Sequence, residues 1–157
     1  FTAKKFTAFG SGAIDLYAYD IIIDKLTLEC SGSSTMDIRG SIGSAKVTTS
    51  GLVDISLANV TGPVEVNARE ASEIFIEAES DSAEGVVITG TTEDASKVQH
   101  AGGRCALSNQ IFSSGCNEAA VPSHTVEPLV WTRGITIIEA FSCHGHTGIS
   151  ASSFIRP

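Results

Sequence analysis

Two kinds of short apolar segment alternate along the first part of the chain, and their spacing constrains the fold more than any other feature. In the first kind an acidic residue stands before an apolar residue, and these acids are spaced by 22, 17 and 19 residues. In the second kind the closing residue recurs at intervals of 19, 19 and 22 residues. The first kind reads Ile14-Asp15-Leu16, Met36-Asp37-Ile38, Val53-Asp54-Ile55 and Ser72-Glu73-Ile74, and the second reads Leu26-Thr27-Leu28, Ala45-Lys46-Val47, Val64-Glu65-Val66 and Val86-Val87-Ile88.

This repeat predicts an all-β solenoid. A unit of about twenty residues with two strands cannot bury its apolar face alone, so successive units must stack. Because side chains alternate between the two sides of a strand, we expect the acids to point outward and their apolar neighbours inward. The expected strands cover residues 13–18, 25–29, 35–39, 45–49, 52–57, 64–67, 73–77 and 86–89.

Other repeat and β folds explain the pattern less well. Leucine-rich repeats share the period but need a dense Leu framework and a positioned Asn, which this sequence lacks. A β-sandwich places strands about every 8 to 12 residues, yet it gives no reason for an acid to recur in alternate strands. Few stretches place apolar residues at helical spacing. The stacked coil remains the predicted architecture.

The turns before these strands resemble those of a known family. Small residues precede the apolar-acidic-apolar strands, and the segments are Phe9-Gly10-Ser11-Gly12-Ala13-Ile14-Asp15-Leu16, Leu26-Thr27-Leu28-Glu29-Cys30-Ser31-Gly32-Ser33 and Val47-Thr48-Thr49-Ser50-Gly51-Leu52-Val53-Asp54-Ile55. This pattern resembles the GIN domain, an autotransporter adhesin head domain, over roughly residues 5–90. The resemblance implies a right-handed parallel β-helix and no catalytic residues. Ser33-Ser34 and Ala71-Ser72 depart from the family's glycines, and cysteines are unusual in it.

We expect a single domain over residues 1–157 with three parts. Residues 1–92 form regular rungs, residues 93–125 form an irregular loop or insert, and residues 126–157 form terminal strands or a cap. A solenoid end exposes its core and unpaired strand edges, so an element must cover it. Trp131, Phe141 and Phe154 supply bulk for that cover.

Charge and cysteine content favour an extracellular location. The net charge of -8 disfavours nucleic acid as a partner, and no apolar run approaches the roughly 18 residues of a membrane span. The four cysteines show no C-x2-C spacing, and Asn59-Val60-Thr61 is a glycosylation sequon before a Gly-Pro turn. These features favour secretion and a glycan on Asn59. The chain opens at Phe1 rather than Met, so we expect sequence upstream of it.

The cysteines predict one disulfide directly. Cys105 and Cys116 both lie in the segment expected to be irregular, where closing a short loop stabilises a region with little core. Cys30 and Cys143 then pair with each other or stay free. Pairing would require the C-terminal segment to fold back toward an early rung.

Two groups of side chains are candidate metal ligands. If the rungs stack in register, Asp15, Asp37, Asp54 and Glu73 form an outward row about 4.8 Å apart, and their repulsion favours counterions or Ca²⁺. The alternative is a solvated polar face that keeps the coil soluble. The second group is Cys143-His144-Gly145-His146, with His100 and His124 elsewhere, for Zn²⁺ or Cu²⁺; solvated histidines on a Gly-rich loop are the commoner case.

Catalysis and ice binding find little support. The sequence has no G-x-S-x-G elbow, and any acidic ladder meets the carboxylate spacing of glycosidases trivially. An ice-binding row would need outward Thr, whereas the corresponding row here reads Thr27, Lys46, Glu65 and Val87. We therefore expect no enzyme activity and no cofactor other than Ca²⁺ in the acidic row.

The expected function is that of a secreted structural or adhesive module. Its partner is an extracellular surface, a glycan, or a second copy in a head-to-tail fibre. Phe1, Phe6 and Phe9 at the chain start, facing residues 149–157, are the assembly candidates, or they plug their own coil. The alternative is a carbohydrate-binding or carbohydrate-cleaving β-helix that uses the acidic row with Ca²⁺.

Overall fold

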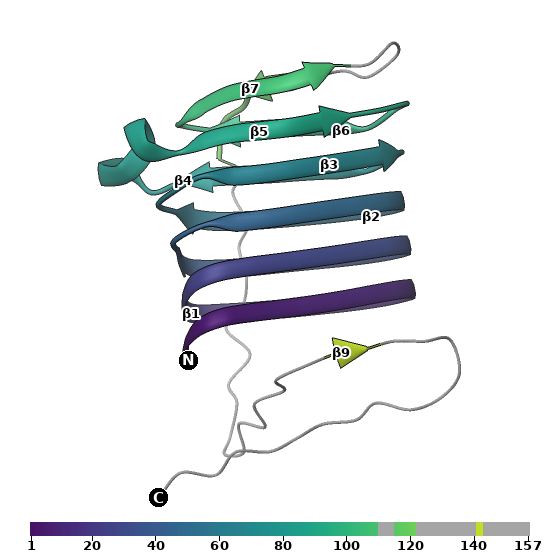
Figure 1. Cartoon of the computed structure of the whole chain (residues 1–157), viewed down its shortest axis with the longest axis horizontal. Helices are drawn as coiled ribbons and strands as arrows, with labels where there is room; N and C mark the ends of the chain where they lie inside the picture. Colours follow the sequence, from purple (N-terminus) through teal and green to yellow (C-terminus); the bar gives the residue numbers. More distant parts are fainter. Residues whose placement is uncertain (110–114, 122–140, 143–157) are drawn as a thin grey trace, which may run out of the picture.

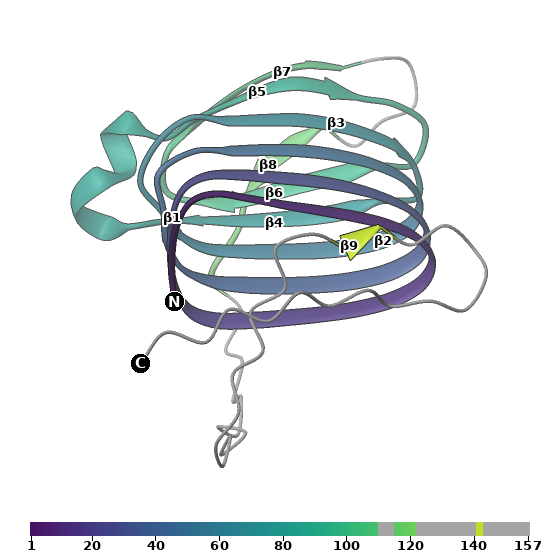
Figure 2. The ribbon, with the colours of Figure 1, turned by 60° about the horizontal axis from the view of Figure 1, so that its bottom comes forward.

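The chain winds into a parallel β-solenoid, as the repeat predicts. The computed structural model describes residues 1–109, 115–121 and 141–142. The coil has about five turns of about 19 residues each, stacked as layers in Figure 1 and seen obliquely from one end in Figure 2. In these described segments, no helix has the length and apolar character to cross a membrane.

The strands follow one another around the coil. The first two are long because they continue through the corners: β1 spans Thr2–Ile42 and β2 spans Ala45–Val60. The other strands are short and end before a corner: β3 (Val64–Glu70), β4 (Glu73–Ala78), β5 (Val87–Thr92), β6 (Lys97–Ala101), β7 (Arg104–Asn109), β8 (Cys116–Glu118) and β9 (Phe141–Ser142). The short helix η1 (Ser80–Gly85) precedes β5. The expected separate strands thus merge in the first turns.

Parallel pairing gives the coil two faces. Face A consists of residues 26–32 of β1, residues 45–51 of β2, and β3, β5 and β7. Face B consists of residues 33–39 of β1, residues 52–58 of β2, and β4, β6 and β8. One inward column of face A reads Leu26, Ala45, Val64, Ile88 and Cys105, and one of face B reads Met36, Ile55, Ile74, Val98 and Cys116.

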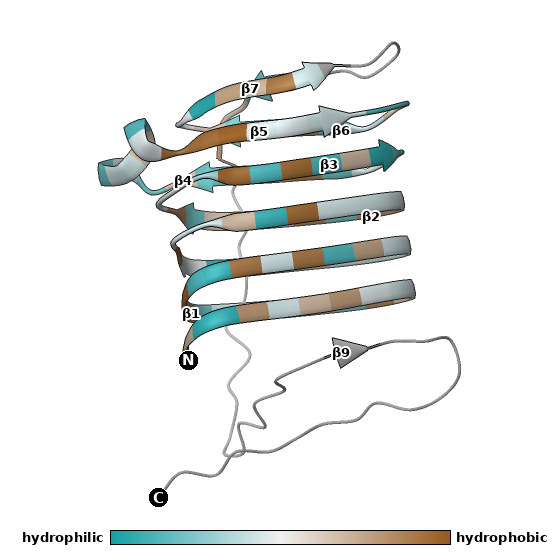
Figure 3. Cartoon of the chain, viewed as in Figure 1, coloured by the Kyte–Doolittle hydropathy of each residue, from teal (hydrophilic) through white to brown (hydrophobic). Residues whose placement is uncertain are grey.

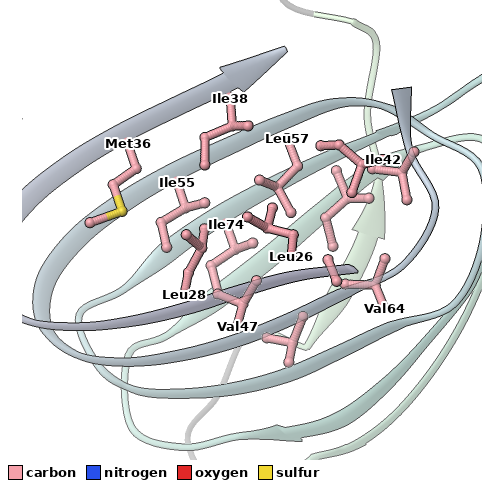
Figure 4. Close-up of a cluster of buried hydrophobic side chains, with 14 of the residues drawn as sticks. Leu26, Leu28, Met36, Ile38, Ile42, Val47, Ile55, Leu57, Val64 and Ile74 are labelled. Carbon is pink, nitrogen blue, oxygen red and sulfur yellow. The ribbon is translucent and has the colours of Figure 1, made fainter. Parts of the chain in front are cut away.

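Aliphatic side chains fill the space between the faces. Met36, Ile38, Val53 and Ile55 are at most 2% exposed, and Ile14 and Leu16 of the first turn pack partly buried against the same cluster. Figure 4 shows this interior, and the alternation of apolar and polar residues along the strands is visible in Figure 3. All six predicted inward positions are confirmed. Full burial of each such side chain contributes about 1.5–3 kcal/mol.

The corner from face A to face B depends on glycine. Gly12, Gly32 and Gly51 all have positive φ, and a Cβ on Gly51 would meet the carbonyl oxygen of Gly32 in the turn below. Glu70 and Asp94 also have positive φ. Stacked turns therefore approach too closely at this corner for a side chain at Gly51.

Buried serines follow the glycine corner and satisfy its carbonyls. The Ser34 hydroxyl donates to the Gly12 carbonyl at 3.3 Å, and the Ser72 hydroxyl donates to the carbonyls of Gly51 and Arg69 at 3.4 and 2.9 Å. Ser96 donates to the carbonyls of Ala68 and Glu93. All three serines are at most 3% exposed. Two of these serines are the departures from the family's glycines, and here they supply hydrogen bonds that a glycine cannot.

The repeat continues further than the sequence indicates. The expected irregular segment 93–125 contains β6, β7 and β8, so the limit of the regular rungs at residue 92 is wrong. The helix η1 lengthens one turn and so changes the spacing of the repeat. Before it, Lys46 contacts Glu65, 19 residues on, whereas across it Glu73 contacts Lys97, 24 residues on. Because of this insertion Val64 pairs with Ile88 rather than Val86, and the outward row reads Thr27, Lys46, Glu65 and Thr89 rather than Val87.

Candidate functional site

The expected acidic row does not form as a continuous ladder. Asp54 pairs with Glu73, but the residue of β1 beside Asp54 is Thr35. Asp37 lies two residues further along, in a row with Ser56, Phe75, Gln99 and Asn117. Asp15 is exposed on the first turn. The prediction of one row of four acids is therefore wrong at Asp37.

Two of the four carboxylates are paired with cations. Lys97 Nζ lies 3.0 Å from Glu73 Oε1, and Arg39 Nε lies 2.9 Å from Asp37 Oδ1. Across the segments that the structure describes, no three His, Cys, Asp or Glu side chains gather in a way that could hold a metal ion. At Glu73 and Asp37 a protein cation therefore stands where Ca²⁺ was expected from the sequence.

Face A carries a hydrogen-bonded ladder on its outer side. Lys46 Nζ lies 2.8 Å from Glu65 Oε1, the Asn67 amide donates to the same oxygen at 3.2 Å, and the Thr91 hydroxyl donates to Asn67 Oδ1 at 3.1 Å. The hydrogen bonds from Lys46 and Asn67 lower the pKa of the exposed Glu65 carboxyl. These four polar side chains therefore bond to one another.

Face B carries an aromatic and charged cluster that the sequence interpretation missed. The Tyr19 hydroxyl donates to Asp37 Oδ2 at 3.2 Å, and the Arg39 guanidinium lies over the Tyr19 ring, 5.9 Å from its centroid. Tyr17, on the same side of the strand, is 55% exposed. Burial and the Asp37 charge raise the pKa of Tyr19, and the hydrogen bond to Asp37 raises that of Arg39. The sequence Tyr17-Ala18-Tyr19 could have indicated this cluster, because alternate residues of a strand lie on the same side.

A disulfide closes the last described turn, as predicted. Cys105 and Cys116 are bonded, with their Cα atoms 6.4 Å apart. Cys105 belongs to the inward column of face A and Cys116 to that of face B. The bond therefore crosses the interior of the coil, where aliphatic side chains meet in the turns below.

The other cysteine of the described residues is a free thiol in the core. Cys30 is 5% exposed, and its sulfur lies 3.3 Å from the Met36 sulfur. Burial raises the pKa of its thiol to about 11, with a smaller contribution from Glu29. Cys143, which the sequence allows either to pair with Cys30 or to stay free, lies outside the described residues, as do His124, His144 and His146. His100 lies inside, 9% exposed, with Nδ1 at 2.9 Å from the Gly102 carbonyl oxygen.

The three phenylalanines of the chain start have different surroundings. Phe6 packs against the core, whereas Phe1 and Phe9 are 46% and 44% exposed. Strand β9 pairs in parallel with this first turn, Phe141 beside Ala8 and Ser142 beside Phe9. Phe6 thus plugs its own coil, and Phe1 and Phe9 remain on the surface. The expected facing segment, residues 149–157, lies outside the described residues.

The glycosylation candidate lies at the other corner of the coil. Asn59 is exposed and adopts a left-handed backbone conformation with φ of 60°. Val60, the next residue, is fully buried, and the Thr61 hydroxyl donates to the Ile42 carbonyl at 3.2 Å. The Asn59 side chain is accessible at the rim of the turn, as the sequon prediction requires.

Known proteins do not identify the chain. Comparison with protein-family models, with curated proteins and with solved structures finds no match in any of the three. The parallel coil agrees with the resemblance to a β-helix domain, but no family match supports the GIN domain in particular.

Proposed function

We propose that the protein is a secreted structural or adhesive module whose coils add head to tail. One observation carries this proposal: the first turn accepts a parallel strand, β9, at Ala8 and Phe9. An edge that pairs with a distant segment of its own chain has backbone donors and acceptors that a strand of another molecule could use in place of that segment.

The opposite end supports the same proposal. Within the described segments, β7 pairs with β5 alone and β8 with β6 alone, so each has one unpaired edge. Both ends share the cross-section of the coil, and a contact between unlike ends does not close into a ring. A second copy that displaces β9 would extend both faces in the same parallel register.

This role also suggests how the module acts and where a glycan would lie. As in the resemblance to the GIN domain, the module would act as an adhesin head that presents surfaces rather than catalyses a reaction. A glycan on Asn59 would project sideways from the corner and leave both ends open. In material from a eukaryotic secretory pathway, mass spectrometry of the Asn59 peptide should show added hexosamine, and an unmodified peptide would contradict the glycan.

Negative charges introduced at the first turn test the proposed head-to-tail assembly. The double substitution Phe1→Asp and Phe9→Asp adds repulsion at an edge that must meet another acidic chain, at two positions that lie outside the buried core. Light scattering and electron microscopy at physiological salt should show filaments of the native chain that this variant loses. Leu52→Asp adds one such charge at the glycine corner, where Leu52 is 67% exposed, and should leave filaments intact. A native chain that stays monomeric at high concentration would refute the proposal.

A further inference from the structure

The outer side of face B differs from that of face A in its chemistry. It carries Tyr17, Tyr19 and Phe75 together with Asp37 and Arg39, whereas the ladder on face A is built from lysine, carboxylate, amide and hydroxyl groups. Asp37, Ser56 and Phe75 form one row across successive turns, with Tyr19 bonded to Asp37 from the first turn. Four stacked strands span roughly 14 Å, so the aromatic and charged groups lie within one patch on the outer side of face B.

The polar part of this surface is held in place before any ligand arrives. Arg39 Nε donates to both oxygens of Asp37, at 2.9 and 3.1 Å, while the guanidinium stays over the Tyr19 ring. A guanidinium carries five N–H donors, and Asp37 takes only the one on Nε. The arginine side chain is 27% exposed, so the donors of its terminal nitrogens are available at the surface. Little side-chain entropy remains to be lost on binding.

The charges around Arg39 select the kind of ligand. Asp37 bonds to it directly, and Glu77 is close enough to act on it electrostatically. Two carboxylates against one guanidinium, on a chain of net charge -8, disfavour an anion such as a sulfated or uronic sugar. The same groups suit a ligand that offers hydroxyls, which accept from Arg39 and donate to the carboxylates. The exposed Tyr17 ring adds an apolar surface with a polar tip beside them.

We propose that this surface, formed by Tyr17, Tyr19, Asp37, Arg39, Phe75 and Glu77, binds a neutral glycan chain. The exposed Tyr17 ring would stack on the C–H face of a sugar, and Arg39, Asp37 and Glu77 would bond to the sugar hydroxyls. The inference gives the adhesive part of the proposed function a ligand, and it does not depend on head-to-tail assembly.

Calorimetric titration with defined hexasaccharides tests the inference. The neutral probes are cellohexaose, laminarihexaose, mannohexaose and chitohexaose, and the anionic probes are heparin hexasaccharide and hexagalacturonate. At least one neutral probe should bind, and Tyr17→Ala should weaken it at least tenfold because the stacking surface is lost. Arg39→Met keeps the side-chain stem but removes the donors and should weaken binding by a similar factor. Melting temperatures verify that both variants are folded.

A matched aromatic substitution separates this inference from assembly. Phe9→Ala removes another exposed ring of the first turn, 44% exposed against 55% for Tyr17, and should leave glycan affinity unchanged even if it alters filaments. Binding of no neutral probe, a preference for the anionic probes, or equal loss in Phe9→Ala and Tyr17→Ala would overturn the glycan surface. None of these results depends on whether filaments form.

Discussion

The middle turns of the coil and its last described turn solve the same packing problem with different chemistry. In the middle, Val64 of face A meets Ile55 and Ile74 of face B between the faces, and all three are completely buried. In the last turn, the same columns end in Cys105 and Cys116, which are joined by a disulfide and remain partly exposed. A middle turn has neighbours above and below, whereas the last described turn has a described neighbour on one side only.

This difference shows where hydrophobic burial stops being sufficient. A side chain at the end of a stack loses only part of its contact with water, so its burial stabilises less. A covalent bond across the interior restricts the unfolded chain instead and does not depend on a further turn. We therefore expect substitutions in the middle to affect the whole fold and changes at the end to affect the end alone.

The largest effect is expected from a charge in the middle of the coil. Ile55→Asp places a carboxylate at a fully buried position without a partner, which costs about 5 kcal/mol or more and should unfold the domain. Asp54→Ser changes the adjacent outward position and should be tolerated. Thermal unfolding followed by circular dichroism compares the two variants, and equal losses would contradict the assigned faces.

The next largest effect should come from the glycine corner. In Gly51→Ala the new Cβ meets the Gly32 carbonyl of the turn below, and φ is also unfavourable, so we expect a loss of about 4 kcal/mol. Gly12→Ala has the same kind of φ but no atom within 4 Å of the new Cβ, so strain alone costs about 1–2 kcal/mol. Denaturant unfolding measures both. Similar losses in the two variants would mean that stacking distance does not matter at this corner.

The sequence predicted the inside of the coil better than its register. Alternation alone assigned Met36, Ile38 and Ile55 to the core, because a strand has only two sides. The spacing of the acids misplaced Asp37. Asp37 precedes Asp54 by 17 residues, and the two cannot align in turns that advance by 19. The sequence pattern also stopped the coil too early, since η1 lengthens one turn and the inward residues after it include His100 and Cys105.

The cluster of Tyr19, Asp37 and Arg39 could not be predicted without the strand register either. Tyr19 and Asp37 are 18 residues apart and meet only because they lie on neighbouring turns. The spacing of acids shows that a repeat exists, but it does not say which outward residues become neighbours. Corner lengths decide that, and small residues at corners leave no periodic apolar signal.

Removal of the disulfide should loosen the last turn and spare the middle. The double substitution Cys105→Ala and Cys116→Ala releases a loop of 11 residues and should cost about 3 kcal/mol. Hydrogen exchange should quicken in β7 and β8 while β2 and β3 keep their protection. Uniformly faster exchange throughout the coil would show instead that the end and the middle unfold together.

The smallest effect concerns the thiol in the middle of the coil. The Cys30 pKa is raised from 9.0 to about 11 because burial disfavours the thiolate, so the folded state holds the proton more tightly than the unfolded state. The resulting stabilisation is fully present below pH 9 and is lost as the pH rises through about 11. Lysines and tyrosines also titrate in this range, so the useful quantity is the difference between the native chain and Cys30→Ala, which shares every other group. Between pH 8 and pH 10.5 the free energy of unfolding of the native chain should fall by about 2 kcal/mol more than that of the variant. Identical pH profiles would mean that the thiolate is accommodated in the folded coil, and that the interior beside Met36 is more polar than the aliphatic columns around it.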